Sequence, residues 1–429
     1  MSWRIDRIRP LIDGEIAETP TSVFLEHGEI RRIGADAERA EADAVTDGEN
    51  QWLLPGLLDL NCHLREPGPD RRGTIASETR AAARGGFTSV CCVPDTSPVN
   101  DSGAVTHLIQ DLARRQGQVR VLPIGAMTRG LEGDRLSDMA GLARAGCVAL
   151  GNAGYAVVNA RVMRRCMAYA RTFDVKLFIQ PENPSLAADG CAHDGVMAAR
   201  LGLAGIPEVA ETTAVNELLM LAAETGVRLH LGPLSCARSV ELVRQAREAG
   251  HAVTSEVGIT HLISTEASID GYDGIYHCRP PLRAETDRQA LLAGVESGVI
   301  DAIVSQHRPS DRAAKQAPFA ETETGLSTVE TVLSLGLRLE SEGALSRERL
   351  MAALTTGPSR VLKRPAPVLA PGSVADFCLL DPEQSWLVSA ENLLSAGKHP
   401  PAPGETLPGV VSLTVLEGRV VYRGDEGRL

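Results

Sequence analysis

Two polar residues end the first long apolar run of the chain, in the segment DLNCHL, where Asn61 and His63 stand two positions apart. Side chains two apart on a β-strand point to the same side, so two histidines at these positions would share a metal ion. The first position holds a neutral amide instead, which is a weak ligand for zinc. The segment therefore has the spacing of a metal-binding motif with one ligand missing, and Cys62 between the pair should point away from it.

Other polar residues follow the later apolar runs, at the places where a barrel of parallel strands carries its reacting groups. They are Asp95, Asn152, Gln180, Glu256, Gln306 and His307, with Pro233 at the corresponding place after the sixth run. A hydrolytic metal centre needs three or four His, Asp or Glu ligands and a base that can take a proton. The amides are weak ligands and the proline has no side-chain donor, so this set predicts a poor metal site.

The remaining histidines leave two interpretations open. The simpler one is that His63 and His307 make hydrogen bonds within a filled polar pocket. The alternative is a metal site displaced from the strand ends, which would use His230, His261, Glu182 and Glu256.

The elements that must position these residues alternate along the middle of the chain. Short apolar runs, typical of buried parallel strands, occur at 52–63, 87–94, 118–127, 147–152, 175–181, 227–232, 251–257 and 299–307. Helical patterns lie between them, at 74–85, 159–173, 206–225, 238–249 and 287–297. Eight strands with intervening helices predict a TIM (β/α)8 barrel, and a doubly wound open sheet is the alternative.

The two ends of the chain have a different pattern. Residues 21–34, 372–381 and 409–424 show alternating apolar runs beside glycines, which predicts hairpins, and the proline-rich stretch 399–408 predicts a loop. Helical patterns at 325–340 and 346–354 separate them from the barrel. We expect a small composite β-sandwich domain from residues 1–54 and 365–429, beside a barrel formed by residues 55–364.

The composition argues against several classes of function. The formal net charge is -12, without a lysine-rich tract, so neither nucleic acid nor an anionic membrane is an expected partner. The N-terminus lacks the apolar core of a signal peptide, and no apolar run is long enough to span a membrane. The nine cysteines contain no CxxC pair, which is typical of scattered buried thiols. We therefore expect a cytoplasmic protein.

Four segments resemble the dihydroorotase branch of the amidohydrolase superfamily. They are DLNCHLREPG (59–68), GTIASETRAAARGGFTSVCCVPDTSPVND (73–101), RPPLR (279–283) and SGVIDAIVSQHRPSDRAAKQAPF (297–319). The resemblance covers nearly the whole chain and implies a barrel of the metal-dependent hydrolase type with a β-domain built from both termini. For an active member it also implies an HxH pair after the first strand and an aspartate after the fourth. Histidines follow the fifth and sixth strands, and an aspartate that is both ligand and base follows the eighth.

Carried over onto this sequence, those six positions keep one ligand. The HxH pair falls on Asn61 and His63, and the fourth-strand aspartate on Asn152 or Ala153. The last three positions fall on Gln180, Pro233 and Gln306. Without a metal, water keeps a pKa near 15.7 instead of about 7, so no hydroxide forms at neutral pH. We expect no metal or other cofactor, whereas zinc is the cofactor if the site is active.

The resemblance also implies residual substrate-binding groups. Arg65 matches the arginine that pairs with the substrate carboxylate, and Asp95 stands where the family has an asparagine and would repel that carboxylate. His307 is a third candidate. The alternative for Arg65 is a salt bridge to a neighbouring acid, Glu66 or Asp59.

For function, the resemblance implies a structural subunit. Some dihydroorotase-like chains without metal ligands assemble with the catalytic subunit of aspartate carbamoyltransferase in pyrimidine biosynthesis, and LNCHLREPG and SQHRPSDRAAK are similar to segments of those chains. We expect an inactive homologue, a pseudoenzyme, that forms a homo-oligomer and is a partner of that enzyme. Two alternatives remain: an active zinc-dependent dihydroorotase or other cyclic amidohydrolase with an atypical metal site, and a small-molecule-binding sensor.

Overall fold

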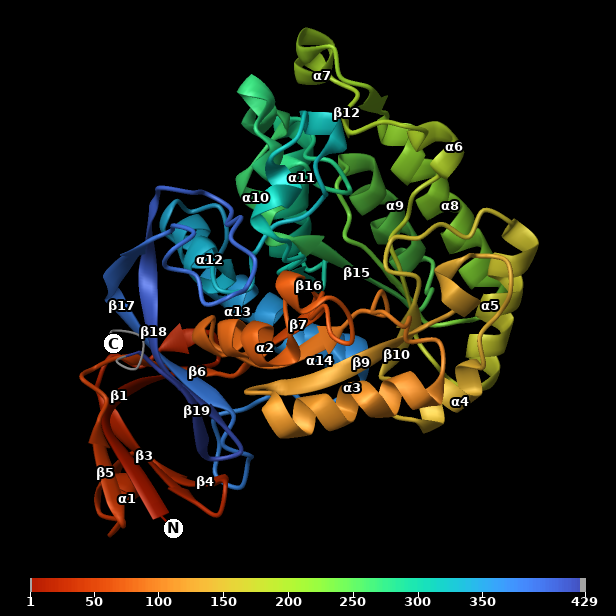
Figure 1. The fold of residues 1–429 in the computed structure, drawn as a ribbon. Helices are drawn as coiled ribbons and strands as arrows, with labels where there is room; N and C mark the ends of the chain where they lie inside the picture. Colours follow the sequence, from red (N-terminus) through yellow and green to blue (C-terminus); the bar gives the residue numbers. More distant parts are fainter. Residues whose placement is uncertain (1, 425–429) are drawn as a thin grey trace.

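A computed structural model describes residues 2–424 and shows a closed barrel of eight parallel strands (Figure 1). The strands follow one another in chain order: β7 (Leu57–Cys62), β8 (Phe87–Cys92), β9 (Arg120–Ala126), β10 (Ala149–Gly151), β11 (Leu177–Ile179), β14 (Leu229–Leu231), β15 (Val253–Gly258) and β16 (Ala302–Val304). A parallel bridge between Cys62 and His307 joins the first strand to the segment after the last one. The predicted barrel is therefore confirmed, and the open-sheet alternative is wrong.

Helices cover the outside of the barrel. The larger ones are α2 (Ile75–Arg84), α3 (Gly103–Gln116), α5 (Ala160–Thr172), α8 (Glu208–Thr225), α9 (Ala237–Glu248), α11 (Glu285–Glu296), α12 (Val332–Ser341) and α13 (Arg347–Leu354). Shorter ones are α4 (Met139–Arg144), α10 (Ile259–Ile263) and α14 (Thr356–Leu362). All five helices predicted between the strands are confirmed. The helix predicted from residue 325 begins only at Val332, because the backbone N–H groups of Thr328 and Val329 donate to the ring of His307 instead.

An excursion leaves the barrel between β11 and α8. It contains α6 (Pro184–Ala187), α7 (Val196–Leu201) and a two-stranded parallel ladder of β12 (Ala192–His193) and β13 (Gly205–Ile206). Asn183 caps α6 by accepting hydrogen bonds from the backbone N–H groups of Ser185 and Leu186. Arg283, which is 4% exposed, fixes this excursion to the barrel by donating to the carbonyl of Ile206.

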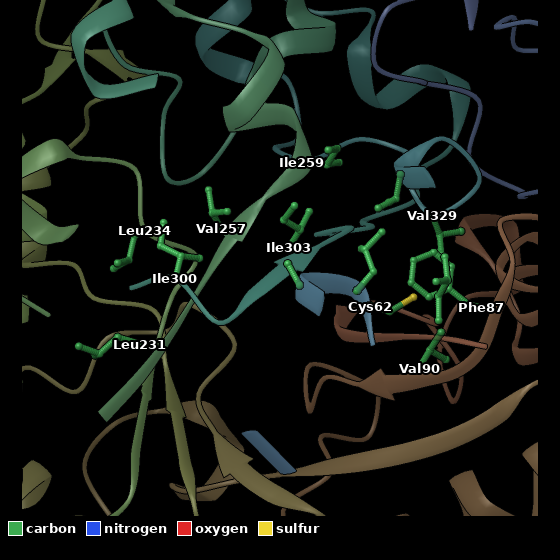
Figure 2. Close-up of a cluster of buried hydrophobic side chains, with 14 of the residues drawn as sticks. Cys62, Phe87, Val90, Leu231, Leu234, Val257, Ile259, Ile300, Ile303 and Val329 are labelled. Atoms are coloured by element: carbon green, nitrogen blue, oxygen red, sulfur yellow. The ribbon is translucent and has the colours of Figure 1, made fainter. Parts of the chain in front are cut away.

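Two apolar layers fill the space inside and outside the strands. Leu58, Leu60 and Ile124 belong to the inner cluster, whereas the outer cluster lies between strands and helices. Figure 2 shows part of the outer cluster, in which Cys62 lies beside Phe87 and Val329. Cys62 therefore points away from the interior of the barrel, as predicted. All nine cysteines are buried free thiols.

Both ends of the chain form one β-domain, drawn in red and blue in Figure 1. The strand order in its sheet is β19 (Arg419–Arg423), β18 (Thr406–Leu416), β17 (Phe377–Leu387), β6 (Trp52–Pro55), β1 (Ser2–Ile12), β3 (Thr21–Glu26) and β4 (Glu29–Ile33). Two further strands, β2 (Glu15–Ile16) and β5 (Ala44–Asp47), pair with β1, and α1 (Ala35–Glu38) follows β4. Ile5, Ile30, Phe377 and Val415 share one core, so the two termini stabilise each other.

Three predictions about this domain need correction. The apolar run 52–63 is two strands, because Pro55 and Gly56 end β6 in the β-domain before β7 begins in the barrel. Residues 372–381 do not form a hairpin, since β17 pairs with β6 and β18. The predicted loop 399–408 ends early, at the start of β18. The hairpins at 21–34 and 409–424 are confirmed, the second one with its turn at Gly418.

Between residues 2 and 424, none of the helices is both long enough and apolar enough to cross a lipid bilayer.

Candidate functional site

A cavity opens at the carboxyl ends of the barrel strands, where reacting groups lie in this fold. Its space, including the open mouth, amounts to about 790 Å³. Most of its polar lining comes from β7, β11, β14, β15 and β16 or the residues just after them, and from two arginines of loops. These residues are Asn61, His63, Gln180, His230, Glu256, Arg279, Gln306 and Arg308. The structure thus brings together most of the strand-end residues that the sequence singled out.

Local irregularities let β7 present two polar residues to this cavity. The pairing of β7 with β8 shifts between Asp59 and Cys62. Asn61 and His63 face the cavity, and Leu60 before them faces the inside of the barrel, so the strict alternation of sides is broken here. Asp59 holds the shift in place by accepting hydrogen bonds from the backbone N–H groups of Ser305, at 3.0 Å, and Asn61, at 3.3 Å. Burial raises the pKa of Asp59 to about 6 even against these bonds.

His63 is oriented by an acid behind it. Its Nδ1 lies 2.8 Å and 2.9 Å from the two carboxylate oxygens of Asp95, and Arg65 Nη1 lies 3.5 Å from the same carboxylate. Burial lowers the pKa of His63 to about 4, so the ring is neutral and donates Nδ1–H. Burial alone would raise the pKa of Asp95, but His63, Arg308 and Arg65 outweigh it and hold that pKa well below its ordinary value. The unprotonated Nε2 of His63 is left as an acceptor on the ring.

Arg65 therefore pairs with a different acid from the two expected. Its guanidinium contacts Asp95 and donates from Nε to the carbonyl of Pro309 at 3.0 Å. Glu66 instead accepts from the N–H of Ile75, and Asp59 accepts from Ser305, so neither forms the predicted salt bridge with Arg65. Arg65 and Asp95 both lie outside the cavity lining. Asp95 neutralises this arginine and positions His63.

A continuous chain of hydrogen bonds runs across the floor of the cavity. Asn61 Nδ2 donates to Glu256 Oε1 at 2.9 Å, and His230 Nε2 lies 3.0 Å from Glu256 Oε2. His230 Nδ1 lies 2.9 Å from the hydroxyl of Thr254, which also accepts from Lys176 at 3.1 Å. An ionised carboxylate only accepts hydrogen bonds, so His230 donates Nε2–H to Glu256. The Thr254 hydroxyl also has the carbonyl of Leu229 as an acceptor, at 3.4 Å. Glu256 is 2% exposed and carries the negative charge of this network.

The other amides of the lining are held by different partners. Gln306, with φ of 51°, donates from Nε2 to the carbonyl of Arg279 at 2.8 Å. Arg279 is itself paired with Glu182, at 2.6 Å. Gln180 Oε1 lies close to Gly154, where a Cβ would approach it to 2.9 Å. At the end of β16 Gln306 is thus held by a hydrogen bond, whereas at the end of β11 Gln180 packs against Gly154.

The structure decides between the two candidates after the fourth strand. Ala153 lines the cavity, whereas Asn152 accepts a hydrogen bond from the Thr128 hydroxyl at 3.1 Å and donates to the carbonyl of Tyr155. Of the two, Ala153 is therefore the residue that faces the cavity. After the sixth strand, Gly232 lines the cavity and Pro233 does not.

This donor set does not fit zinc. Of the six positions, only His63 offers an imidazole or a carboxylate, since the others hold Asn61, Ala153, Gln180, Pro233 and Gln306. Zinc needs three or four such ligands. Between residues 2 and 424, no three His, Cys, Asp or Glu side chains converge as a metal site would require.

The displaced metal site is also not formed. Glu256 and His230 do touch, but His261 Nε2 lies 3.1 Å from the carbonyl of Pro280. Glu182 is bound to Arg279 instead. Four residues that the sequence offered as ligands are thus divided among three separate contacts.

His307 lies behind the cavity wall. It is completely buried, its Nε2 lies 2.8 Å from Glu78 Oε2, and its Nδ1 accepts from the backbone N–H groups of Thr328 and Val329. Both ring nitrogens are therefore occupied, which confirms the hydrogen-bonded interpretation for His307. With no free nitrogen and no exposed surface, it does not face a ligand.

Three residues of the site were not among the sequence candidates. Arg279 and Arg308 line the cavity, and Glu78 anchors its wall from α2. Arg308 directly follows the Gln306-His307 pair, so its place after the eighth strand could have identified it as a residue of the site. Glu78 lies within an amphipathic helix, and the sequence does not distinguish it from the other polar residues of that helix.

A parallel barrel with its polar residues at the carboxyl ends of the strands, beside a β-domain from both termini, is the architecture of the amidohydrolase superfamily. The comparisons narrow the class. The Dihydro-orotase-like family model matches residues 50–239, and a "Dihydroorotase-like protein" from Pseudomonas aeruginosa is 44% identical over 402 residues, 94% of this chain and 95% of that one. The chain belongs to the dihydroorotase-like family.

Further relatives carry a different name. A "Dihydroorotase" from Anaeromyxobacter dehalogenans is 39% identical over 407 residues, 94% of each chain. Among solved structures, an L-hydantoinase (dihydropyrimidinase) from Arthrobacter aurescens has a TM-score of 0.87 at 24% identity and covers 98% of this chain and 96% of its own. At that identity, the likeness concerns the fold alone.

Proposed function

We propose that this chain is a catalytically inactive dihydroorotase homologue that serves as an assembly subunit for aspartate carbamoyltransferase in cytoplasmic pyrimidine biosynthesis. The observation that carries the first half is the lining of the cavity. Five of the six positions that hold metal in active relatives carry an amide, an alanine or a proline, inside an otherwise complete barrel. The second half is supported by the resemblance of LNCHLREPG and SQHRPSDRAAK to segments of non-catalytic subunits.

The chemistry of the remaining groups supports inactivity. Gln306 stands at the position of the base, but an amide does not accept a proton at neutral pH, and its Nε2–H is already donated to Arg279. Glu256 is a carboxylate in the cavity, yet it accepts bonds from His230 and Asn61. The hydrolysis of a stable cyclic amide by water alone would need an activated nucleophile that this lining does not supply.

An active dihydroorotase is the second candidate, because relatives 39% identical carry that name. We expect purified protein to hold less than about one-tenth of a zinc ion per chain, since one imidazole does not retain zinc. We also expect no turnover of dihydroorotate with added Zn²⁺ or Mn²⁺. Elemental analysis and a hydrolysis assay check both points. Stoichiometric metal together with hydrolysis would establish the second candidate instead.

The assembly role predicts a stable complex. Co-expression with the cognate aspartate carbamoyltransferase should give one peak in size-exclusion chromatography with light scattering. That peak should contain both chains and have a larger mass than either protein alone, including any homo-oligomer of this chain. Gln180→Ala is a matched control, because this side chain lines the cavity and its loss should leave assembly unchanged. Separate elution of the two wild-type chains would contradict the proposal.

A further inference from the structure

The cavity has opposite charges at its buried and its open end. Glu256, 2% exposed, places a carboxylate at the floor, and the amide of Asn61 beside it is uncharged. Arg308 lines the same cavity but is half-buried, so it lies nearer to solvent. A metal centre would place positive charge where Glu256, Asn61 and His63 stand. Without such an ion, the floor presents a carboxylate and neutral acceptors, and so it is suited to a cationic group of a ligand.

The floor is rich in unused hydrogen-bond acceptors. Glu256 accepts one bond at each carboxylate oxygen, from Asn61 and His230, although a carboxylate can accept about four. Asn61 Oδ1 and His63 Nε2 accept no bond from residues 2–424. A ligand that enters must therefore offer N–H donors to the floor, because a buried acceptor left without a partner costs free energy.

Within residues 2–424, Arg308 forms no salt bridge of its own, although its charge acts on Asp95 from a distance. Arg65, Arg72 and Arg279 are each paired with a carboxylate, namely Asp95, Glu323 and Glu182. Arg308 Nη1 donates only to the Thr324 hydroxyl, at 3.3 Å, and no carboxylate between residues 2 and 424 lies within 4.0 Å of it. A guanidinium in this state is suited to bind a carboxylate through two parallel hydrogen bonds.

We propose that the cavity binds a small zwitterion, with an ammonium or guanidinium group on Glu256, Asn61 and His63 and a carboxylate on Arg308. The ligand class is an amino acid or a guanidino acid. A cationic head is required because Glu256 is desolvated, and a positive partner offsets that cost better than a neutral amide does. Dihydroorotate and carbamoyl aspartate offer N–H donors but no cationic group, so they leave the charge of Glu256 uncompensated. The inference rests on the metal-free site proposed above but not on the assembly role.

Calorimetry with a series of ligands tests this assignment. The probes are ω-amino acids from glycine to 6-aminohexanoate and their guanidino counterparts, titrated in EDTA into the full chain. Butanoate and butylguanidine each keep one end only, and carbamoyl aspartate represents a ligand without the cation. We expect at least one zwitterion to bind, and the single-ended compounds and carbamoyl aspartate to bind at least ten-fold more weakly.

Two substitutions locate the ligand. Glu256→Gln and Arg308→Gln should each weaken the best zwitterion at least ten-fold, whereas Arg72→Gln, which removes a paired arginine outside the cavity, should not. Arg308 is partly exposed, so its variant folds even if Glu256→Gln does not. Absence of binding across the series, or unchanged binding by Arg308→Gln, would overturn the assignment, as would tighter binding of carbamoyl aspartate. If no zwitterion binds, the complex with aspartate carbamoyltransferase can still form, so the assembly role is tested separately. Zinc-dependent turnover would contradict the proposed inactivity instead.

Discussion

Glu78→Ala is expected to lower the free energy of unfolding by about 3–5 kcal/mol, because it leaves several buried donors without an acceptor. The Glu78 carboxylate is completely buried and accepts bonds from His307 at 2.8 Å, from the Ser395 hydroxyl at 2.6 Å and from the N–H of Ala396 at 3.0 Å. One side chain thus joins α2, the segment after β16 and the C-terminal part of the chain. Urea denaturation followed by circular dichroism measures the loss.

The pH dependence provides a second readout of the same contact. Burial would raise the pKa of Glu78, but His307, Ser395 and Ser77 outweigh it and hold the pKa below its ordinary value. A lowered pKa means that the contribution is present above the unfolded value and is lost as pH falls through the folded one. The difference between wild type and Glu78→Ala should therefore shrink in acid. Glu248→Ala, an exposed helical glutamate paired with Arg244, is the control and should change little. A Glu78→Ala protein as stable as this control would show that the donors find other partners.

The alternation of strands and helices was predictable because it depends on local periodicity. The apolar runs at 175–181 and 227–232 contain β11 and β14, and Gly226 before β14 ends α8 with φ of 66°. The first barrel strand was placed wrongly for a related reason. An apolar run does not reveal that Trp52–Pro55 pairs with β17, more than 300 residues further along the chain.

Contacts across the barrel account for most of what the sequence did not predict in the site. Asn61 and Glu256 are 195 residues apart, and His307 and Glu78 are 229 apart, so only closure of the barrel brings them together. Asp95 illustrates the consequence. From sequence it was expected to repel a substrate carboxylate, whereas the fold turns it toward Arg65 and His63, where its charge is compensated.

The backbone of the site has kept strained conformations. Arg65, Ala153 and Gln306 all have positive φ, at 65°, 48° and 51°, which costs about 1–2 kcal/mol for each residue that is not glycine. Such conformations persist where the surrounding structure imposes them, and they cluster at sites of function. Two of these residues, Ala153 and Gln306, line the cavity, so the strained backbone directs their side chains toward it.

Restoring the lost side chains should accordingly restore metal. A variant with Asn61→His, Ala153→Asp, Gln180→His, Pro233→His and Gln306→Asp is expected to bind about one zinc ion per chain or more, where we expect none in wild type. His63 and the five new side chains then supply more than the three or four ligands that zinc needs. His63 is already held by Asp95 through Nδ1, the arrangement that orients a ligating imidazole. Elemental analysis after dialysis measures the metal.

Two companion variants test the geometry rather than the ligand count. Moving the aspartate from position 153 to 152 should weaken zinc binding, because Asn152 faces Thr128 and Tyr155 and not the cavity. Omitting Pro233→His should matter less than omitting Gln306→Asp, since Gln306 lines the cavity and Pro233 does not. Equal zinc in the 152 and 153 variants would show that the strand end after β10 is not fixed as described. If the variant with all five substitutions binds no zinc, the positions of the strand ends themselves, and not only their side chains, are unsuited to a metal ion.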